Sequence, residues 1–395
     1  MFKRSAARAA PSPTIPYDPP MAAVPVELVE TARRLGAAHD VADLGDVSIK
    51  DAGTLRVKRS GARLAELSVD DFVELDRARL DTTLETGFPR EDAARAAAFE
   101  EALLGARLRG DETPIVDSLI HHVLPGRVVV HLHPQAICAV TCCGSGQYLA
   151  KDWFKKHEVP VVWLERVEEG VTLAKALVKA LAKSKRPPLD AAVLVSNGGV
   201  YVQGEEPAGV EAAVAALLAT LAEKKVEQEV TEPEAIGPPD PARLDAFAAA
   251  LAAAAEAPAT ATDASPAVLA LLARPSVRDA ALRGPIWPDQ VVHCGSYPCH
   301  AADDGGAVEA ALQPALQEHV EDNDEHPQVL LVRPHGVVTT GPTPAAAAVA
   351  AEVFAAAAGV YVGSELMGVT RIVPAKDRRA LDASSWTAAR RAAAT

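Results

Sequence analysis

The sequence contains few aromatic residues, methionines and cysteines. Phenylalanine, tyrosine and tryptophan make up 4% of its 395 residues, and there are three methionines and five cysteines. An odd number of cysteines in a long chain argues against a disulfide scaffold and favours a reducing compartment, so we expect a cytoplasmic protein. No run of 18 apolar residues is free of charges and prolines, and no membrane span is therefore predicted.

The sequence also lacks an excess of positive charge. Its formal net charge is −14 and its pI is about 5.3. Binding to nucleic acid needs clustered lysine and arginine side chains, so no nucleic-acid partner is expected. Residues 1–22 are predicted to be a flexible tail, because they contain basic residues and prolines but not the apolar core of a signal peptide.

Predicted strands and helices alternate along most of the chain, which indicates an α/β or α+β fold. We assign residues 23–226 to a first domain. Residues 227–264 are predicted to be a linker that contains one helix, with Pro258–Asp263 as its final Pro/Ala/Thr segment. Residues 265–395 are predicted to form a second, smaller α/β part.

The stretch Arg127–Pro134 combines a predicted buried strand with two histidines. Three consecutive valines favour a strand, which Pro134 ends. Because side chains alternate between the faces of a strand, His131 and His133 should point the same way. Two imidazoles at this spacing can hold one metal ion. Two core histidines with ordinary hydrogen bonds are the alternative interpretation.

Two segments of the chain resemble each other. Val193–Gly204 and Leu330–Gly341 both read as strand, glycine turn, strand and glycine, and both lead into an Ala/Val-rich helix. In this register Gly198 lies opposite His335. A second Val-Val-His sequence, Val291–His293, is a weak counterpart of the His-x-His strand. We interpret the pattern as a partial duplication, and coincidence is the alternative because such units are common.

Several segments together resemble the class II aldolase/adducin superfamily. They are similar above all to the aldolase part of the rhamnulose-1-phosphate aldolase/short-chain dehydrogenase fusion proteins. The dehydrogenase half is missing, since the chain has no Gly-x-Gly-x-x-Gly stretch. The similar segments are Leu44–Lys50, Val57–Gly61, Pro114–Pro125, Val128–Pro134 and Gly170–Ala176, with Gly284–Gly295 resembling a segment that follows the aldolase part.

The resemblance implies an α/β/α layered fold with a mixed, mainly antiparallel sheet, to which the second part is added. It also implies zinc or another divalent metal, a small-molecule substrate and a homo-oligomer. In this family three histidines hold the metal. The metal polarises a hydroxy-carbonyl compound and stabilises the enediolate that C–C cleavage leaves.

The implied metal ligands match this sequence only in part. His131 and His133 match the family's His-x-His pair. Gly198 stands where the third histidine should be, and two histidines alone hold zinc weakly. His335 is the candidate replacement, provided that the second copy packs against the first within the chain or across a subunit interface.

The other implied site residues match with two changes. Asp117 stands at the position of the catalytic glutamate and is predicted to be the acid/base, although an ordinary helix N-cap is the alternative. Ser60 and Gly61 match the Ser-Gly of the phosphate loop and are predicted to bind the substrate. Asp46 stands where the family has asparagine, and a carboxylate there would repel a phosphate.

These residues lead to two main hypotheses. The first is a metal-dependent lyase that acts on a small hydroxy-carbonyl compound, a sugar or sugar phosphate, through an enediolate. The second is a non-catalytic relative that serves as a binding or assembly module, because the departures at Asp46, Asp117 and Gly198 affect three functions at once. Epimerisation or decarboxylation would use the same enediolate chemistry and cannot be separated from aldol cleavage by sequence.

Overall fold

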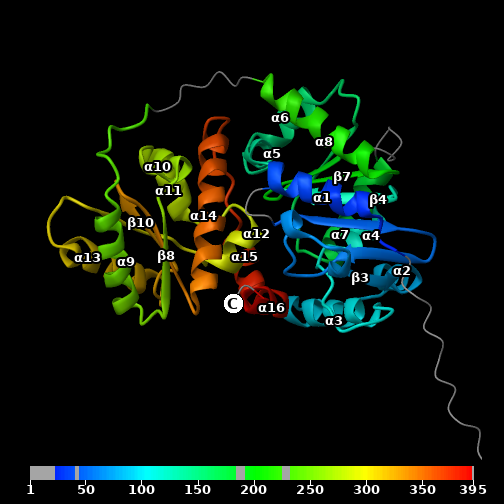
Figure 1. The fold of residues 1–395 in the computed structure, drawn as a ribbon, viewed down its shortest axis with the longest axis horizontal. Helices are drawn as coiled ribbons and strands as arrows, with labels where there is room; N and C mark the ends of the chain where they lie inside the picture. The colour runs from blue at the N-terminus through cyan, green and yellow to red at the C-terminus, as the bar shows by residue number, and fades with distance from the viewer. Residues whose placement is uncertain (1–22, 41–43, 184–191, 225–231, 394–395) are drawn as a thin grey trace, which may run out of the picture.

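The structure is a computed structural model that describes residues 23–40, 44–183, 192–224 and 232–393. These residues form two α/β parts, each with its own sheet (Figure 1). The predicted tail, residues 1–22, lies outside the described residues, as does the first part of the predicted linker, residues 227–231.

The larger sheet has seven strands in the order β3-β2-β1-β4-β7-β6-β5. Neighbouring strands are antiparallel except for β5 and β6, which are parallel, so the expected mixed, mainly antiparallel sheet is confirmed. The strands are β1 (Asp46–Lys50), β2 (Thr54–Lys58), β3 (Phe72–Asp76), β4 (Val128–Leu132), β5 (Val161–Leu164), β6 (Ala192–Val195) and β7 (Val200–Gly204).

Helices cover both faces of this sheet and give the expected α/β/α layers. One face is covered by α1 (Val26–His39), α5 (Gln135–Thr141), α6 (Gly146–Trp153) and α8 (Pro207–Ala222). The other face is covered by α2 (Arg77–Glu85), α3 (Asp92–Gly105), α4 (Ser118–Val123) and α7 (Val171–Lys183). Two short 3-10 helices, η2 (Leu64–Glu66) and η3 (Val69–Asp71), lie between β2 and β3.

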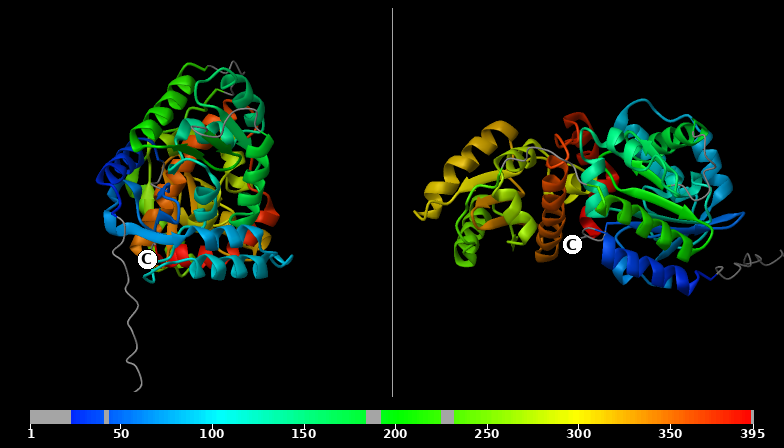
Figure 2. Two further views of the ribbon diagram at one scale, coloured as in Figure 1. Left: turned by 90° about the vertical axis from the view of Figure 1, so that its right-hand side faces the viewer. Right: turned by 90° about the horizontal axis from the view of Figure 1, so that it is seen from above.

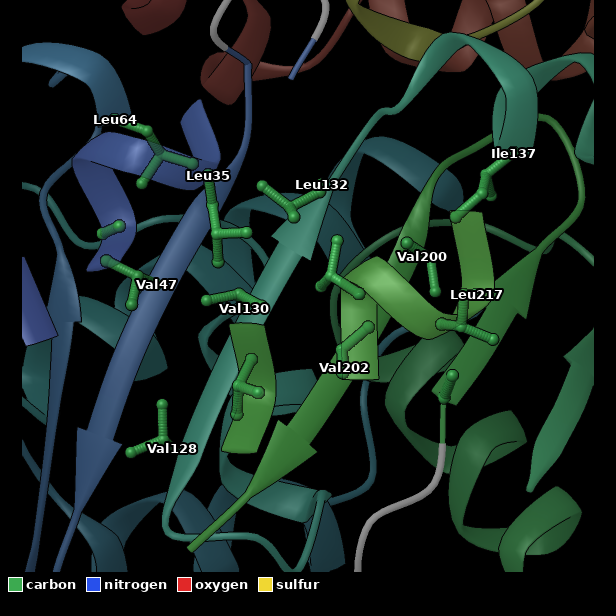
Figure 3. Packing of buried hydrophobic residues seen from close by; sticks show 14 of the residues in the cluster. Leu35, Val47, Leu64, Val128, Val130, Leu132, Ile137, Val200, Val202 and Leu217 are labelled. Atoms are coloured by element: carbon green, nitrogen blue, oxygen red, sulfur yellow. The ribbon is translucent and has the colours of Figure 1, made fainter. Parts of the chain in front are cut away.

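Strand β4 lies in the middle of the sheet and is buried along its whole length. Val130 and Leu132 belong to the core beneath α1 and α8, together with Val202 of β7 (Figure 3). Val129 belongs to the core on the opposite face. The alternation predicted from the sequence is therefore confirmed, and it turns His131 toward the face that α4 and α7 cover.

The second sheet has four strands in the order β8-β11-β10-β9, of which only β9 and β10 are parallel. Its strands are β8 (Ala259–Asp263), β9 (Cys299–Ala302), β10 (Val329–Arg333) and β11 (Gly336–Gly341). One face carries α9 (Pro241–Ala254) and α13 (Val308–Asn323). The other carries α10 (Pro266–Leu272), α11 (Pro275–Arg283), α12 (Pro288–Cys294) and α14 (Pro344–Glu365).

The second sheet repeats the order and directions of β4, β5, β6 and β7. In both copies the residues at the turn align as expected, with His335 at the position of Gly198. Strand β8 is the counterpart of β4, and Thr262 takes the place of His131. The proposed counterpart Val291–His293 is wrong, because these residues lie in helix α12. The second copy therefore has no histidine pair at this position.

The predicted linker at Pro258–Asp263 is also wrong. Residues Ala259–Asp263 form strand β8, which pairs with β11, and helix α9 packs on the same sheet. The reason is visible in the sequence Ala-Thr-Ala-Thr-Asp, since threonine favours strands and the alternation has a period of two. The second part therefore begins at or before Pro241, rather than at Ser265.

Helix α14 joins the two parts. It packs against α5 of the first part and against α10 and β8 of the second, and Figures 1 and 2 show it standing between the two sheets. It is long and apolar enough to cross a membrane by length and composition, but 56% of its apolar window is buried inside the molecule. Helices α15 (Ala375–Asp382) and α16 (Ser385–Ala393) then return the chain to α3 of the first part.

Candidate functional site

A row of three polar side chains crosses the middle of the larger sheet. His131 of β4 pairs in register with Asp46 of β1 on one side and with Tyr201 of β7 on the other. Residues directly opposite each other on neighbouring strands project from the same face. The rings of His131 and Tyr201 are stacked, with centroids 4.0 Å apart. Strand pairing alone therefore brings an acid, an imidazole and a phenol together.

Asp117 lies directly over this row. Its Oδ2 accepts a hydrogen bond from the Tyr201 hydroxyl at 2.6 Å and lies 3.3 Å from His131 Nδ1. Asp117 occupies the N-cap position of α4, but its side chain makes no capping hydrogen bond. The N-cap interpretation therefore does not describe this carboxylate, which is buried and faces the site.

His133 lies next to His131 but has a different partner. The two rings have centroids 4.5 Å apart, which fits the expectation that both point the same way. His133 Nδ1 lies 3.3 Å from Asp40 Oδ1, and the backbone N–H of His133 donates a hydrogen bond to the same oxygen at 2.7 Å. A carboxylate beside one ring nitrogen leaves the other nitrogen for a metal, as is common in metal centres.

Burial and charge set the protonation of this cluster. Burial alone would lower the pKa of His131, but the carboxylates of Asp117 and Asp46 raise it to about 9. Burial alone would raise the pKa of Asp46, yet Lys58 at 3.2 Å and His131 hold it well below its ordinary value. The pKa of Asp117 is also lowered, against its burial, mainly by His131. Two buried carboxylates therefore stay charged beside one cation.

The donor set fits a divalent metal ion. Asp46, Asp117 and His131 each offer one ligand atom, and these atoms lie within 4.8 Å of one another. Two ligands on opposite sides of one ion at about 2.1 Å span about 4.2 Å, so small side-chain movements suffice. His131 Nδ1 lies 3.3 Å from Asp117 and 3.8 Å from Asp46, and His133 Nδ1 lies 3.3 Å from Asp40, but neither nitrogen makes a well-formed hydrogen bond among the described residues. A metal ion would take the place of the proton that His131 shares with the two carboxylates.

These residues open into a cavity of about 320 Å³. Ser60 and Gly61 line it, and Gly61 has a φ of 81°, a conformation that favours glycine. The Ser60 N–H is already used, since it donates to Thr113 O at 2.8 Å. Gly198 also lines the cavity. Every predicted site residue except His335 therefore lines the cavity.

The structure does not bring His335 to the histidine pair within this chain. His335 lies at the turn between β10 and β11, and both of its ring nitrogens have partners in the second part. A Cβ added at Gly198 would meet its nearest neighbour, Val195, at 3.4 Å, which is an ordinary contact distance. Glycine therefore stands where the family has its third histidine, although the fold tolerates a Cβ there.

Sequence reasoning missed several residues of the cavity and of its surroundings. Tyr201 and Lys58 hold the two carboxylates, and Asp40 holds His133. Trp386 and Arg390 come from the C-terminal helix α16. A phenol amid the valines of a predicted strand was the one available signal for Tyr201, whereas the others depend on long-range contacts.

Comparison with known proteins gives the family. The family described as "Class II Aldolase and Adducin N-terminal domain" matches residues 26–225 and 238–362, so each sheet falls within a matched stretch. A Bacillus subtilis protein named "Uncharacterized oxidoreductase YuxG" is 32% identical over 92 residues, which are 23% of this chain and 12% of that protein. The match therefore spans only about an eighth of that relative's length.

Solved structures with similar folds cover half of the chain. The N-terminal class II aldolase domain of a Thermoplasma acidophilum protein is 19% identical, with a TM-score of 0.42, over 50% of this chain and 91% of that one. An L-fuculose-1-phosphate aldolase from Thermus thermophilus is 22% identical, with a TM-score of 0.30, over 50% of this chain and 88% of that one. The family match covers more than half of the sequence, and the chain belongs to the class II aldolase and adducin family.

Proposed function

We propose that this protein is a metal-dependent carbon–carbon lyase that acts on a small hydroxy-carbonyl compound, a sugar or sugar phosphate, through an enediolate. The observation that supports the proposal most is the convergence of Asp46, Asp117 and His131 in one buried group with metal-ligand spacing. A bound zinc ion or other divalent ion would supply a Lewis acid for the substrate oxygens.

The residues around the proposed metal position would have different roles. His131 and Asp46 would hold the ion, with His133 beside them, and Lys58 would keep Asp46 ionised. Asp117 is the third possible ligand of that group, but we assign it to moving the proton, because it is a buried carboxylate whose orientation the Tyr201 hydroxyl fixes.

The substrate would occupy the cavity beside the metal ligands. Ser60 and Gly61 would contact its anionic end. The negative charge of Asp46, which would repel a phosphate, is offset by the ammonium of Lys58 at 3.2 Å. We further infer a homo-oligomer with small-molecule substrates, as the family implies. The odd number of cysteines favours a cytoplasmic location, and we infer no nucleic-acid or membrane partner.

A second candidate is a non-catalytic binding or assembly module. The glycine at position 198, in place of the expected third histidine, favours it. Asp46 weakens this alternative, because its carboxylate could serve as a metal ligand where the family has an amide. Metal binding separates the two candidates, since a module without chemistry has no need of the ion.

Metal titration of the purified chain tests the proposal. We expect one divalent ion per chain in the wild type when Zn²⁺ and Mn²⁺ are titrated and the bound metal is counted. His131→Ala should lower the affinity about 100-fold, because one of the few nitrogen ligands is lost. His326→Ala is the matched control, since His326 is exposed. A wild-type chain that takes up neither metal would refute the proposal.

A further inference from the structure

The cavity has a second wall that the proposed metal chemistry does not use. Pro288, Asp289 and His293 of α12 and Val349 of α14 line it from the second part, and Trp386 and Arg390 line it from α16. Figure 1 shows α16 beside α3 of the first part. Trp386 and Arg390 therefore line the cavity from a helix that lies outside the aldolase-like domain in the sequence. This wall is where substrate atoms remote from the metal would lie.

Helix α16 is fixed on both sides. The Trp386 ring belongs to the same core cluster as Phe99 and Leu173 of the first part. On the other side, Arg391 Nε donates to Val292 O of α12 at 2.7 Å. A helix held in this way presents its remaining side chains in a defined direction.

Two hydrogen-bond donors of α16 share one face. Trp386 and Arg390 are four residues apart, which places them on the same side of a helix. Trp386 lines this cavity and a neighbouring one and is 6% exposed, and its Nε1–H, which can only donate, has no partner among the described residues. A buried donor without an acceptor is costly, so it calls for a ligand oxygen.

Arg390 is positioned by a buried carboxylate. Its guanidinium forms an ion pair with Asp289, whose side chain is 10% exposed. One carboxylate oxygen engages only part of the guanidinium, which has five N–H donors in a planar fork. The fork matches a carboxylate or a phosphate, and the remaining N–H groups can serve one.

We propose that Arg390 and Trp386 bind an anionic oxygen group, a carboxylate or a phosphate, on the part of the substrate that lies away from Asp46, Asp117 and His131. This contact is separate from the one that Ser60 and Gly61 would make. The identity of the reacting end rests on the proposed function, but the binding of the anion does not. The second part and α16 thus provide a specificity wall, and substrates without an anionic group would bind weakly.

Anion titration tests this inference. Inorganic phosphate and acetate are titrated calorimetrically into the full chain, both metal-loaded and metal-free. We expect Arg390→Gln to weaken the preferred anion about 10-fold to 100-fold, because a charge-assisted hydrogen bond is lost. Trp386→Phe keeps the ring and removes only the N–H, so a loss of about 3-fold to 10-fold is expected. Arg379→Gln on α15 is the matched control, since Arg379 is exposed.

Each outcome has a defined meaning. Tighter binding of phosphate or of acetate identifies which anionic group the wall accepts. Wild-type anion affinity in both Arg390→Gln and Trp386→Phe overturns the inference, as does the absence of binding of both anions to the wild type. Circular dichroism checks that the variants fold. A chain that binds no metal but loses anion affinity in Arg390→Gln would refute the lyase proposal and leave this inference intact.

Discussion

The ring of His335 is held by Asp303 of the second part. His335 Nε2 lies 2.7 Å from Asp303 Oδ2, while Nδ1 accepts a hydrogen bond from the Asp240 N–H at 3.0 Å. Because Nδ1 accepts, the proton is on Nε2, which donates to the carboxylate. Arg243 Nε donates to the same oxygen at 2.7 Å. The imidazole therefore completes a local network, and neither ring nitrogen is left for a metal.

We predict that His335→Gln changes stability and leaves metal binding unchanged. The substitution removes a hydrogen bond to a buried carboxylate, and we expect the free energy of unfolding to fall by about 1–3 kcal/mol. The metal affinity should stay within about 2-fold of the wild type. Urea denaturation measures the first quantity and metal titration the second. A large loss of metal affinity without a loss of stability would restore His335 as a ligand, across a subunit interface.

Gly198→His should strengthen metal binding. The position lines the cavity, and a Cβ there would meet its nearest atoms at 3.4 Å, an ordinary contact distance. A further nitrogen ligand should raise the affinity for Zn²⁺ at least about 10-fold. Gly198→Ala is the control for the change of backbone freedom. Equal affinities in the two variants would show that the turn does not face the ion.

Local patterns in the sequence predicted the elements of the site correctly. The valines before His131 predicted β4, and the alternation of side chains predicted the common direction of His131 and His133. The internal repeat also predicted the register that aligns Gly198 with His335. Each of these features depends on neighbours in the chain, where propensity and periodicity act directly.

Contacts between distant segments could not be predicted in this way. Asp46 and Tyr201 flank His131 only because β1 and β7 pair with β4, and one sequence does not contain that pairing. The strand at Ala259–Asp263 was not predicted, because the alanines and the neighbouring proline indicate a linker, whereas only the two alternating threonines indicate a strand. Arg390 could not be connected with the site, since its position depends on the return of α16 to the first part.

Acid should destabilise the protein partly through His293. Burial, with a smaller effect from Arg391, lowers the pKa of His293 to about 4, whereas the unfolded chain has its ordinary value near 6.5. As the pH falls from 6.5 to 4, the unfolded state therefore takes up this proton first. The contribution of neutral His293 to the free energy of unfolding is fully present above pH 6.5. Between pH 6.5 and pH 4 it falls by up to about 1.4 kcal/mol per pH unit.

In His293→Gln the free energy of unfolding should fall less steeply as the pH is lowered, because glutamine takes up no proton. Urea denaturation at several pH values between 4 and 7 measures the slope. The control is His326→Gln, which alters an exposed histidine and should retain the wild-type slope. If the His293 variant keeps the full pH dependence, this histidine is not held neutral by the fold.

Asn197 should couple the two parts of the molecule. It has a φ of 52° in the turn between β6 and β7, and its Nδ2 donates at 2.8 Å both to Ile286 O and to Arg371 O. Asn197→Gly keeps the left-handed backbone accessible and removes both hydrogen bonds. Each bond contributes about 0.5–1.5 kcal/mol, so we expect the free energy of unfolding to fall by about 1–3 kcal/mol.

The same substitution should also weaken anion binding. Gly198 of this turn lines the cavity, so the anion affinity measured by calorimetric titration should fall in Asn197→Gly as well. Asn323→Gly, at the end of α13, is the comparison variant, and it should change stability but not anion binding. Unchanged anion binding in Asn197→Gly would mean that other contacts hold the wall formed by the second part.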